Sequence, residues 1–224
     1  MAHGLTVDWL GRVPYGAALA RQEAAVAERR SGGSGDRLLL LEHPPVITLG
    51  RSARAENLLT PRDELARKGV ALHEVARGGD VTYHGPGQLM GYTIVDLQAR
   101  GMPDVHAFLR LIETTLIEAL AELGVAGGTE PGKTGVFVAG SQPPRKLASI
   151  GLGLRGWVTW HGFALNATLD PAGFGDIVPC GLHGVEMTSV ARERERGGAP
   201  AEPAAALFDR ARACVARAFA RALA

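Results

Sequence analysis

The sequence predicts an α+β fold in which helices pack on a mostly antiparallel sheet. Helical and strand patterns do not alternate regularly along the chain, which disfavours a doubly wound parallel sheet. Residues 146–154 and 157–165 have the pattern of a β-hairpin with Arg155 and Gly156 at its tip. Residues 105–123 carry apolar side chains at spacings of three and four, as an amphipathic helix does.

The amino-terminal part is expected to form a helix, two strands and a short helix. Residues 14–30 start with a proline, are alanine-rich and end before a glycine-rich segment, so they predict a helix. Residues 37–42 contain four consecutive leucines and predict a buried strand, and residues 46–49 predict a second one after a His-Pro-Pro break. Residues 61–68 predict a short helix that the following glycine ends.

A polar stretch rich in glycine, residues 77–89, lies between predicted strands at residues 70–75 and 89–95. Because glycine lets a ligand approach the backbone closely, this stretch is either a ligand-binding segment or a pair of turns joining strands. The helix of residues 105–123 follows. Its apolar face is expected to contain Val105, Phe108, Leu109, Ile112, Leu116, Leu120 and Leu123, with Arg110, Glu113, Glu118 and Glu122 elsewhere.

In the carboxy-terminal part, a strand at residues 135–138 precedes the hairpin, and residues 166–190 show no regular period. The charged residues 191–200 are expected to be mobile. A last helix at residues 202–223 is expected to bury Leu207, Phe208, Ala211, Cys214, Val215 and Phe219. The whole chain, residues 1–224, is predicted to be a single domain, with residues from about 180 to 224 as the candidate for a small subdomain.

Composition argues against several classes of protein. Net charge is +1, from 24 basic and 23 acidic residues, whereas a nucleic-acid-binding protein needs a concentrated basic surface. No apolar run approaches the ~20 residues of a membrane span, and the amino terminus lacks the pattern of a secretory signal. We therefore expect a cytoplasmic protein whose two cysteines are reduced. Only three lysines occur, Lys68, Lys133 and Lys146, so each of them is a stronger candidate for a specific role than a lysine in a lysine-rich chain.

Cys180 is the first candidate for chemistry, because it lies between Pro179 and Gly181 on a tight loop where a thiol is accessible. Cys214 lies on the apolar face of the last helix and is expected to be a packed thiol. A nucleophilic cysteine needs a partner that stabilises its thiolate or moves protons. The candidates for that partner are Lys146, His84, His161 and His183.

These partners leave three kinds of site open. A metal site is one, although the spacing matches no short zinc signature. A Cys–His hydrolase is the second. The third uses Lys146, which begins an apolar strand: an ammonium beside the thiol favours thiolate, and a desolvated lysine can take up a proton near neutral pH. A lysine that merely screens the edge of a sheet is the alternative reading of Lys146.

The chain resembles the lipoyl(octanoyl) transferase family, the octanoyl-acyl-carrier-protein:protein transferases. Five segments, in the family's order, carry the resemblance over residues 38–190. They are Pro44-Pro-Val-Ile-Thr-Leu-Gly-Arg51, Arg77-Gly-Gly-Asp-Val-Thr-Tyr-His-Gly-Pro-Gly-Gln-Leu89, Arg145-Lys-Leu-Ala-Ser-Ile-Gly151, His161-Gly-Phe-Ala-Leu-Asn166 and Pro179-Cys-Gly-Leu182.

The resemblance implies a fold shared with the catalytic domains of biotin and lipoate ligases, and roles for particular residues. Cys180 matches the family's acyl-thioester cysteine, and Lys146 matches its partner lysine. No metal and no cofactor are implied, since the substrate arrives on the phosphopantetheine arm of acyl carrier protein. The octanoyl-binding residues implied are Arg77, Gly78, Gly79, Asp80, Val81, Thr82, Tyr83, His84, Ser149, Ile150, Gly151, Gly162, Phe163 and Ala164.

The expected partners are octanoyl-acyl carrier protein and the lipoyl domains of 2-oxoacid dehydrogenase complexes and of the glycine cleavage H protein, with no nucleic acid, no membrane and a monomeric enzyme. Ile150, Phe163 and Leu165 are expected to line an apolar slot for the octanoyl chain. Arg77 is expected either to pair with Asp80 or to reach an acid of the carrier protein. The alternatives are an ATP-dependent lipoate or biotin ligase of the same fold, and a non-catalytic acyl-binding module.

Overall fold

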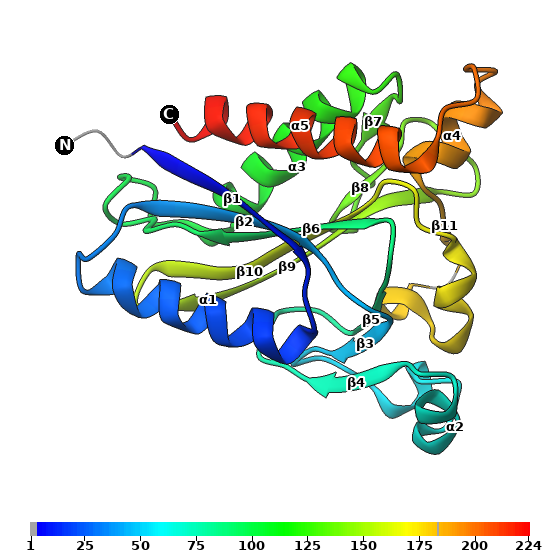
Figure 1. Cartoon of the computed structure of the whole chain (residues 1–224), viewed down its shortest axis with the longest axis horizontal. Helices are drawn as coiled ribbons and strands as arrows, with labels where there is room; N and C mark the ends of the chain where they lie inside the picture. The colour runs from blue at the N-terminus through cyan, green and yellow to red at the C-terminus, as the bar shows by residue number, and fades with distance from the viewer. Residues whose placement is uncertain (1–3, 183) are drawn as a thin grey trace.

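The computed structural model describes residues 4–182 and 184–224, and it has an α+β architecture with two sheets (Figure 1). The larger sheet has the strand order β1-β2-β6-β10-β9-β8-β7, with β11 paired to β9, and the smaller has the order β4-β3-β5. The strands are β1 Leu5–Arg12, β2 Asp36–Glu42, β3 Val46–Leu49, β4 Ala71–Glu74, β5 Val81–His84, β6 Gln88–Ile94, β7 Gly127–Gly128, β8 Val136–Val138, β9 Arg145–Arg155, β10 Val158–Asn166 and β11 Glu186–Met187.

Strand pairing is mostly antiparallel, as the sequence predicts; the parallel pairs are β1–β2, β3–β4 and β9–β11. No helix among the described residues is long and apolar enough to cross a membrane. The helices are α1 Tyr15–Arg30, α2 Arg62–Arg67, α3 Val105–Glu122, α4 Val190–Arg196 and α5 Ala204–Ala222, with short 3-10 turns η1 Ala55–Asn57, η2 Pro171–Asp176 and η3 Pro179–Gly181.

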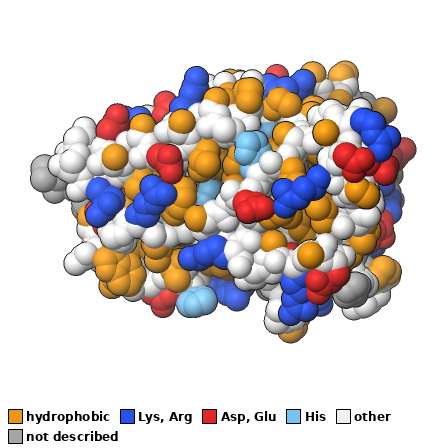
Figure 2. Space-filling model, turned by 90° about the horizontal axis from the view of Figure 1, so that it is seen from below, with side chains coloured by type: hydrophobic (Ala, Val, Ile, Leu, Met, Phe, Trp, Pro, Cys, Tyr) orange, Lys and Arg blue, Asp and Glu red, His pale blue; other side chains and the backbone are white. Residues whose placement is uncertain are grey.

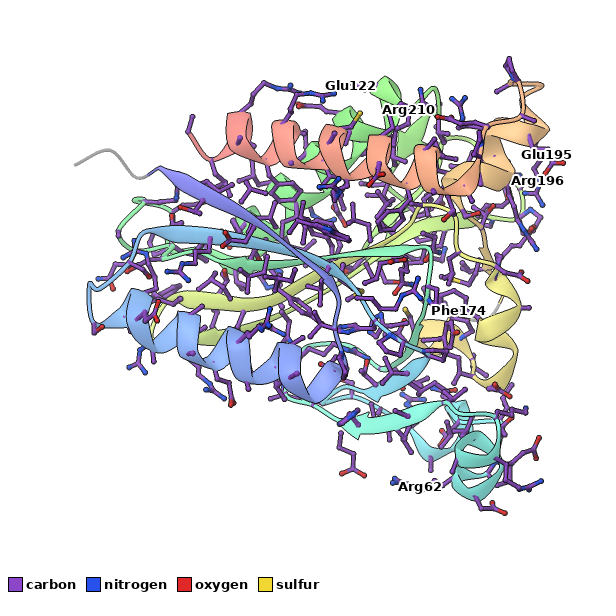
Figure 3. All side chains as sticks on the ribbon, in the orientation of Figure 1. Arg62, Glu122, Phe174, Glu195, Arg196 and Arg210 are labelled. Carbon is purple, nitrogen blue, oxygen red and sulfur yellow. The ribbon has the colours of Figure 1, made fainter. Side chains whose placement is uncertain are left out.

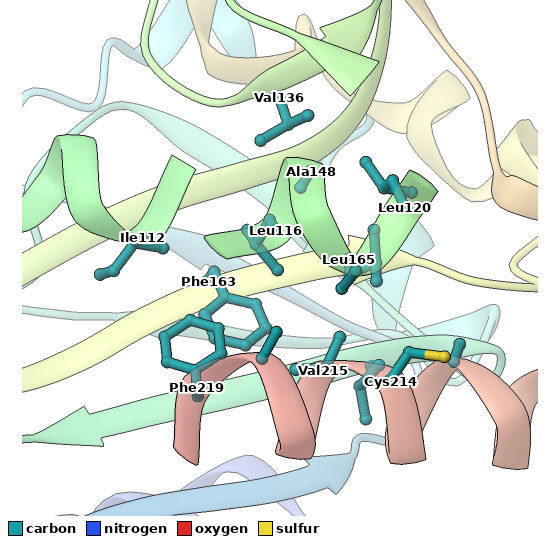
Figure 4. Close-up of a cluster of buried hydrophobic side chains, with 14 of the residues drawn as sticks. Ile112, Leu116, Leu120, Val136, Ala148, Phe163, Leu165, Cys214, Val215 and Phe219 are labelled. Atoms are coloured by element: carbon teal, nitrogen blue, oxygen red, sulfur yellow. The ribbon is translucent and has the colours of Figure 1, made fainter. Parts of the chain in front are cut away.

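The large sheet lies between α1 on one face and the pair α3 and α5 on the other (Figure 1). The predicted apolar face of α3 is confirmed at Phe108, Ile112, Leu116, Leu120 and Leu123, which are all buried. All six residues expected to be buried by the last helix are buried as well, Cys214 among them (Figure 4). Because α5 packs in the same core as α3 and the large sheet, the carboxy-terminal helix contributes directly to the main body of the fold.

The small sheet has its own apolar core, separate from those of the large sheet. It is built from β3, β5, α2, the segment around η2 and Met187 of β11, and Phe174 lies within it (Figure 3). On the face seen from below, which includes this region, basic and acidic side chains are interspersed (Figure 2), as expected for a chain of almost zero net charge. The single-domain prediction for residues 1–224 stays a prediction.

The structure corrects several local predictions. Residues 5–12, for which no element was predicted, form the edge strand β1, and part of the glycine-rich stretch is a strand, β5. Residues 191–200 are not simply a mobile charged segment, because α4 begins at Val190 with the Ser189 hydroxyl accepting from the Arg192 N–H. The hairpin tip is one residue later than predicted, at Gly156 and Trp157, whose φ of 56° and 64° suit a two-residue turn.

Glu113 is a further correction. The helical pattern of α3 puts it outside the apolar face, yet only 1% of its surface is exposed. Its carboxylate accepts the backbone N–H of Gly135 at 2.9 Å and pairs with the guanidinium of Arg110. Polar contacts, not apolar packing, therefore explain why this side chain is buried.

Candidate active site

A cavity of about 230 Å³ lies where the α1-facing side of the large sheet meets the small sheet. Two rows of residues across β6, β10 and β9 form its floor. The first is Met90, Ala164 and Ser149, and the second is Tyr92, Gly162 and Gly151. The remaining residues that line it are Tyr15, Arg77, Gly78, Gly79, Asp80, Thr82, His84, Gly132, Lys133, Thr134, Lys146, Ile150, His161, Phe163, Cys180 and Leu182.

Lys146 and Cys180, 34 positions apart in the sequence, meet at this cavity. The Lys146 Nζ lies 3.7 Å from the Cys180 Sγ, and the Ser149 Oγ lies 3.8 Å from the same sulfur. Lys146 is 2% exposed, with its ammonium over the Phe137 ring at 5.3 Å from the centroid. The amine of Lys146 therefore lies beside a partly exposed thiol, the arrangement of a cysteine nucleophile with a neighbour that can transfer protons.

The loop that carries Cys180 is fixed by the glycine-rich stretch. Cys180 has a φ of 56°, a left-handed conformation that is uncommon for a residue with a side chain. Asp80 accepts hydrogen bonds from the Asn57 amide and from two backbone N–H groups, and the Asn57 carbonyl accepts from the Val178 N–H. A Cβ on Gly181 would lie 2.7 Å from the Asp80 carboxylate, so glycine is required for this close approach.

Arg77 does not form the predicted pair with Asp80. Its guanidinium donates to the backbone carbonyl of Thr48 at 2.7 Å, to the Thr48 hydroxyl at 2.8 Å, and to the Gly78 carbonyl at 3.0 Å. Burial lowers the pKa of this guanidinium. Arg77 thus joins the glycine-rich stretch to β3; the other expected role, contact with an acid of a carrier protein, stays a prediction.

The glycine-rich stretch divides between two sides of β5. Thr82 and His84 line the cavity, whereas Val81 and Tyr83 belong to the core of the small sheet, where the Tyr83 ring packs on Phe174 at 5.6 Å between centroids. Because side chains of a strand alternate in direction, these four residues cannot share one face. Val81 and Tyr83, expected among the octanoyl-binding residues, therefore support the wall from behind.

The apolar side chains expected in the slot point the other way. Phe163 borders the cavity, but its ring stacks on Phe219 at 5.0 Å in the core between the sheet and α5 (Figure 4). Ile150, directly opposite Phe163 on β9, packs against the same core, and Leu165 lies wholly within it. Other residues with apolar surface that line the cavity are Met90, Ala164, Leu182, Tyr15 and Tyr92.

Of the described candidate histidines, neither His84 nor His161 forms a hydrogen bond with the Cys180 sulfur. Burial lowers the pKa of His84 and of His161 to about 3, so both imidazoles are neutral near pH 7 and are weak bases. His84 shares a hydrogen bond with Gln88 at 2.7 Å, and the sulfur's side-chain partners are Lys146 and Ser149. His183, the remaining candidate partner, lies outside the described residues. Across residues 4–182 and 184–224, no group of three or more His, Cys, Asp or Glu side chains is arranged to hold a metal ion.

These neutral histidines predict a loss of stability in mild acid. The unfolded chain protonates a histidine near its usual pKa of 6.5, whereas folded His84 and His161 stay neutral down to about 3. Their contribution to stability is therefore complete above pH 6.5 and is lost as the pH falls, by up to about 1.4 kcal/mol per pH unit for each histidine. Urea unfolding between pH 7 and 5 checks this, with His84→Gln expected to reduce the slope. An unchanged slope in that variant, with His106→Gln as a surface control, would contradict the assignment.

The fold and the cavity together define a catalytic domain of the lipoate-ligase type that carries a thiol–amine pair. One solved structure that shares the fold is a lipoate-protein ligase A bound with ATP, which is 17% identical with a TM-score of 0.70; the match covers 100% of this chain and 86% of that one. Another is a bipartite lipoate protein ligase from Thermoplasma acidophilum, which is 15% identical with a TM-score of 0.69; the match covers 98% of this chain and 84% of that one. Residues 14–211 match the model of the lipoyl protein ligase A/B catalytic domain, and the chain belongs to that family.

Curated relatives narrow the position within the family. An octanoyltransferase of Geobacter metallireducens is 50% identical over 181 residues, which cover 81% of this chain and 79% of the relative. An octanoyltransferase of Solibacter usitatus is 51% identical over 173 residues, which cover 77% of this chain and 76% of the relative. The family resemblance and the shared ligase fold predicted from the sequence are therefore confirmed.

Sequence reasoning missed several residues of the cavity wall. Tyr15, Met90 and Tyr92 come from α1 and β6, and only the packing of these elements brings them to Cys180. Lys133, from the loop before β8, also lines the cavity. The scarcity of lysines is the sequence signal for it, since two of the three lysines in the chain lie in this wall.

Proposed function

We propose that this chain is an octanoyltransferase that passes the octanoyl group through a thioester on Cys180 to a lysine of a lipoyl domain. Relatives about 50% identical, named octanoyltransferases, support the overall activity. The single observation that supports the covalent route is the 3.7 Å contact between the Lys146 Nζ and the Cys180 Sγ at the cavity. The proposed donor is octanoyl-acyl carrier protein, and the proposed acceptors are the lipoyl domains of 2-oxoacid dehydrogenase complexes and the glycine cleavage H protein.

The first half of the reaction forms the acyl-enzyme. The Cys180 thiolate attacks the carbonyl carbon of the donor thioester, a new carbon–sulfur bond forms, and the phosphopantetheine sulfur leaves as a thiol that takes up a proton. The charged Lys146 stabilises the attacking thiolate and supplies that proton. Backbone N–H groups near Cys180 and Gly181 are the proposed donors to the oxyanion that forms in between.

The second half moves the octanoyl group to nitrogen. The acceptor lysine arrives mostly as ammonium, so it must lose a proton before it attacks the thioester. Lys146, neutral after the first half, takes that proton, and the carbon–nitrogen bond forms as the carbon–sulfur bond to Cys180 breaks. The second proton lost by the attacking nitrogen passes to the departing sulfur, and the thiol gives it up to solvent before the next cycle. Exchange between thioesters is nearly energy-neutral, and conversion of a thioester to an amide is downhill, so no nucleotide is needed and we propose that no cofactor takes part.

The proposed binding site of the octanoyl chain is the cavity beside Cys180. Each methylene buried against Met90, Ala164, Tyr15 and Tyr92 is worth about 0.8 kcal/mol, so an octanoyl chain gains several kcal/mol there. Gly151 and Gly162 lie in the floor because a side chain would clash there: a Cβ on Gly151 would lie 2.9 Å from the Gly78 carbonyl oxygen, and the backbone of Gly91 blocks one on Gly162.

Cys180→Ala tests the covalent route. Mixed with octanoyl-acyl carrier protein, the wild-type protein is expected to gain the mass of one octanoyl group and to lose it on hydroxylamine treatment. Cys180→Ala is expected to gain none and to lower transfer to a lipoyl domain by a factor of about 10³ or more. Cys214→Ala is the matched control, because Cys214 is buried in the helical core away from the cavity. Full transfer by Cys180→Ala would rule out the thioester.

ATP separates this function from its alternatives. Transfer from octanoyl-acyl carrier protein is expected to run at the same rate with and without ATP. A requirement for ATP, with free octanoate as substrate, would make the protein a ligase like the lipoate-protein ligase A whose fold it shares. Tight octanoyl binding without any transfer would make it a non-catalytic acyl-binding module.

A further inference from the structure

We propose that Glu113 is a positioning residue for Lys146, acting through the backbone of Gly135; this rests on the proposed role of Lys146. Glu113 is on α3, and it neither lines the cavity nor contacts Lys146. Its carboxylate is nevertheless buried and receives the Gly135 N–H at 2.9 Å. Burying a carboxylate costs free energy even when it is paired, so its presence here indicates a structural or functional role.

Gly135 forms one side of the slot that holds the Lys146 side chain. It has a φ of 117°, and a Cβ built on it would lie 2.8 Å from the Lys146 Cε and 3.3 Å from the Nζ. A side chain at position 135 would therefore clash with the end of the lysine, and glycine leaves that space to Lys146. Any shift of this residue by a few tenths of an ångström changes the space in which the ammonium sits.

Phe137 forms the other side of the slot. Its ring lies under the ammonium of Lys146, and Phe137 is paired with Lys146 across β8 and β9. The pairing of these strands is irregular between Val136 and Phe137, so the ladder alone does not fix the segment that begins with Gly135. The Glu113 carboxylate supplies the missing anchor from the helix.

The anchor itself is rigid. Around Glu113, the helix α3 is held in the main core by Ile112 and Leu116, and the second oxygen of the carboxylate is occupied by Arg110. By fixing Gly135 relative to α3, the hydrogen bond from Glu113 also restricts where the Lys146 side chain can lie. It thereby sets the distance of 3.7 Å between the Lys146 Nζ and the Cys180 Sγ. Lys133 and Thr134, which precede Gly135 and line the cavity, are held by the same bond.

A double-mutant cycle on the reactivity of Cys180 tests the proposal, since alkylation by iodoacetamide reports the thiolate without any acyl substrate. Glu113→Met is expected to slow alkylation near neutral pH by about 10- to 100-fold and to move its pH profile to higher pH, because small misplacements of catalytic groups have effects of this size. Glu113→Gln, which keeps an acceptor for the Gly135 N–H, is expected to restore the rate to within about 3-fold of the wild type.

The cycle with Lys146→Ala separates positioning from general support of the fold. If Glu113 acts through Lys146, adding Glu113→Met to Lys146→Ala is expected to change the alkylation rate by less than about 2-fold. The proposal would be overturned if Glu113→Met lowered the alkylation rate by the same factor in the wild type and in Lys146→Ala. It would also be overturned if Glu113→Met alone left the pH profile of alkylation unchanged. Thr115→Val, which removes a buried hydrogen bond from the same helix, is the control and is expected to keep the wild-type profile.

One further variant and one further measurement distinguish a failure of folding, or of the proposed function, from a failure of the role of Glu113. If Glu113→Met does not fold, Glu113→Asp replaces it; this variant keeps the charge but withdraws it from Gly135, and a smaller loss of the same kind is expected. Octanoyl transfer by the same set of variants shows which idea fails. Loss of alkylation without loss of transfer would refute the role of Cys180 and Lys146, whereas wild-type alkylation and transfer in Glu113→Met and Glu113→Asp would refute only the role of Glu113.

Discussion

Lys146→Ala is expected to lower octanoyl transfer by about 10²- to 10⁴-fold, the range that a positioned acid–base group supplies. The variant removes the cation 3.7 Å from Cys180 and the group that accepts the proton of the incoming amine. Both half-reactions are therefore expected to slow. Rapid mixing with octanoyl-acyl carrier protein, followed by addition of a lipoyl domain, measures them separately. Lys68→Ala is the matched control, since Lys68 forms surface ion pairs with Glu64 and Asp176.

Lys146→Arg divides the two roles of the lysine. Arginine remains charged, so it can still favour the thiolate, but it cannot take a proton from the acceptor amine. We expect partial recovery of acyl-enzyme formation and none of amide formation. Amide formation at the wild-type rate in either variant would show that another group removes the proton from the acceptor.

Phe163→Ala is expected to lower the free energy of unfolding by about 3–5 kcal/mol, the usual cost of removing a buried aromatic ring. The ring is 2% exposed and stacks on Phe219, so its loss leaves a hole in the core between the sheet and α5. Below the unfolding transition, the preference for an eight-carbon chain is expected to be unchanged, because the ring points away from the cavity. Urea unfolding and a chain-length series measure the two effects.

Phe219→Ala is the control for that experiment. It removes the other ring of the pair, from a helix that does not line the cavity, and is expected to cost a similar amount of stability. If Phe163→Ala shifted the preferred chain length while Phe219→Ala did not, the Phe163 ring would have to contact the substrate after all.

The helices and the central strands could be predicted because their apolar residues follow a clear period. The face of α3 and the buried residues of α5 are examples. The strand β5 was missed because glycines flank it and its four residues bury both sides, so it shows no alternation. The strand β1 is an edge strand with exposed positions, and α4 is a short charged helix fixed by contacts such as Glu193 with Arg145. The local sequence pattern alone therefore does not determine any of the three elements β1, β5 and α4.

Within the site, the sequence pointed to Cys180 and Lys146, which lie 3.7 Å apart at the cavity, but not to the direction of the side chains around them. Ile150, Phe163 and Leu165 share one face of the hairpin, as predicted, but it is the face toward α3 and α5. A strand pattern shows which residues share a face and leaves open which layer that face meets. The same limit explains why Tyr15 and Met90 were missed, since Tyr15 reaches the cavity through the packing of α1 on the sheet and Met90 through the pairing of β6 with β10.

The apolar core of the small sheet has a consequence for motion. The floor of the cavity belongs to the large sheet, and the opposite wall belongs to the stretch that leads into β5, whose inward side chains pack only in the small core. Rocking of the small sheet would widen or narrow the passage for an incoming acyl arm, with Met187 of β11 as an apolar contact that links the small-sheet core to the large sheet. Amide hydrogen exchange is therefore expected to be faster in β3 to β5 than in β9 and β10, and to slow once Cys180 is octanoylated.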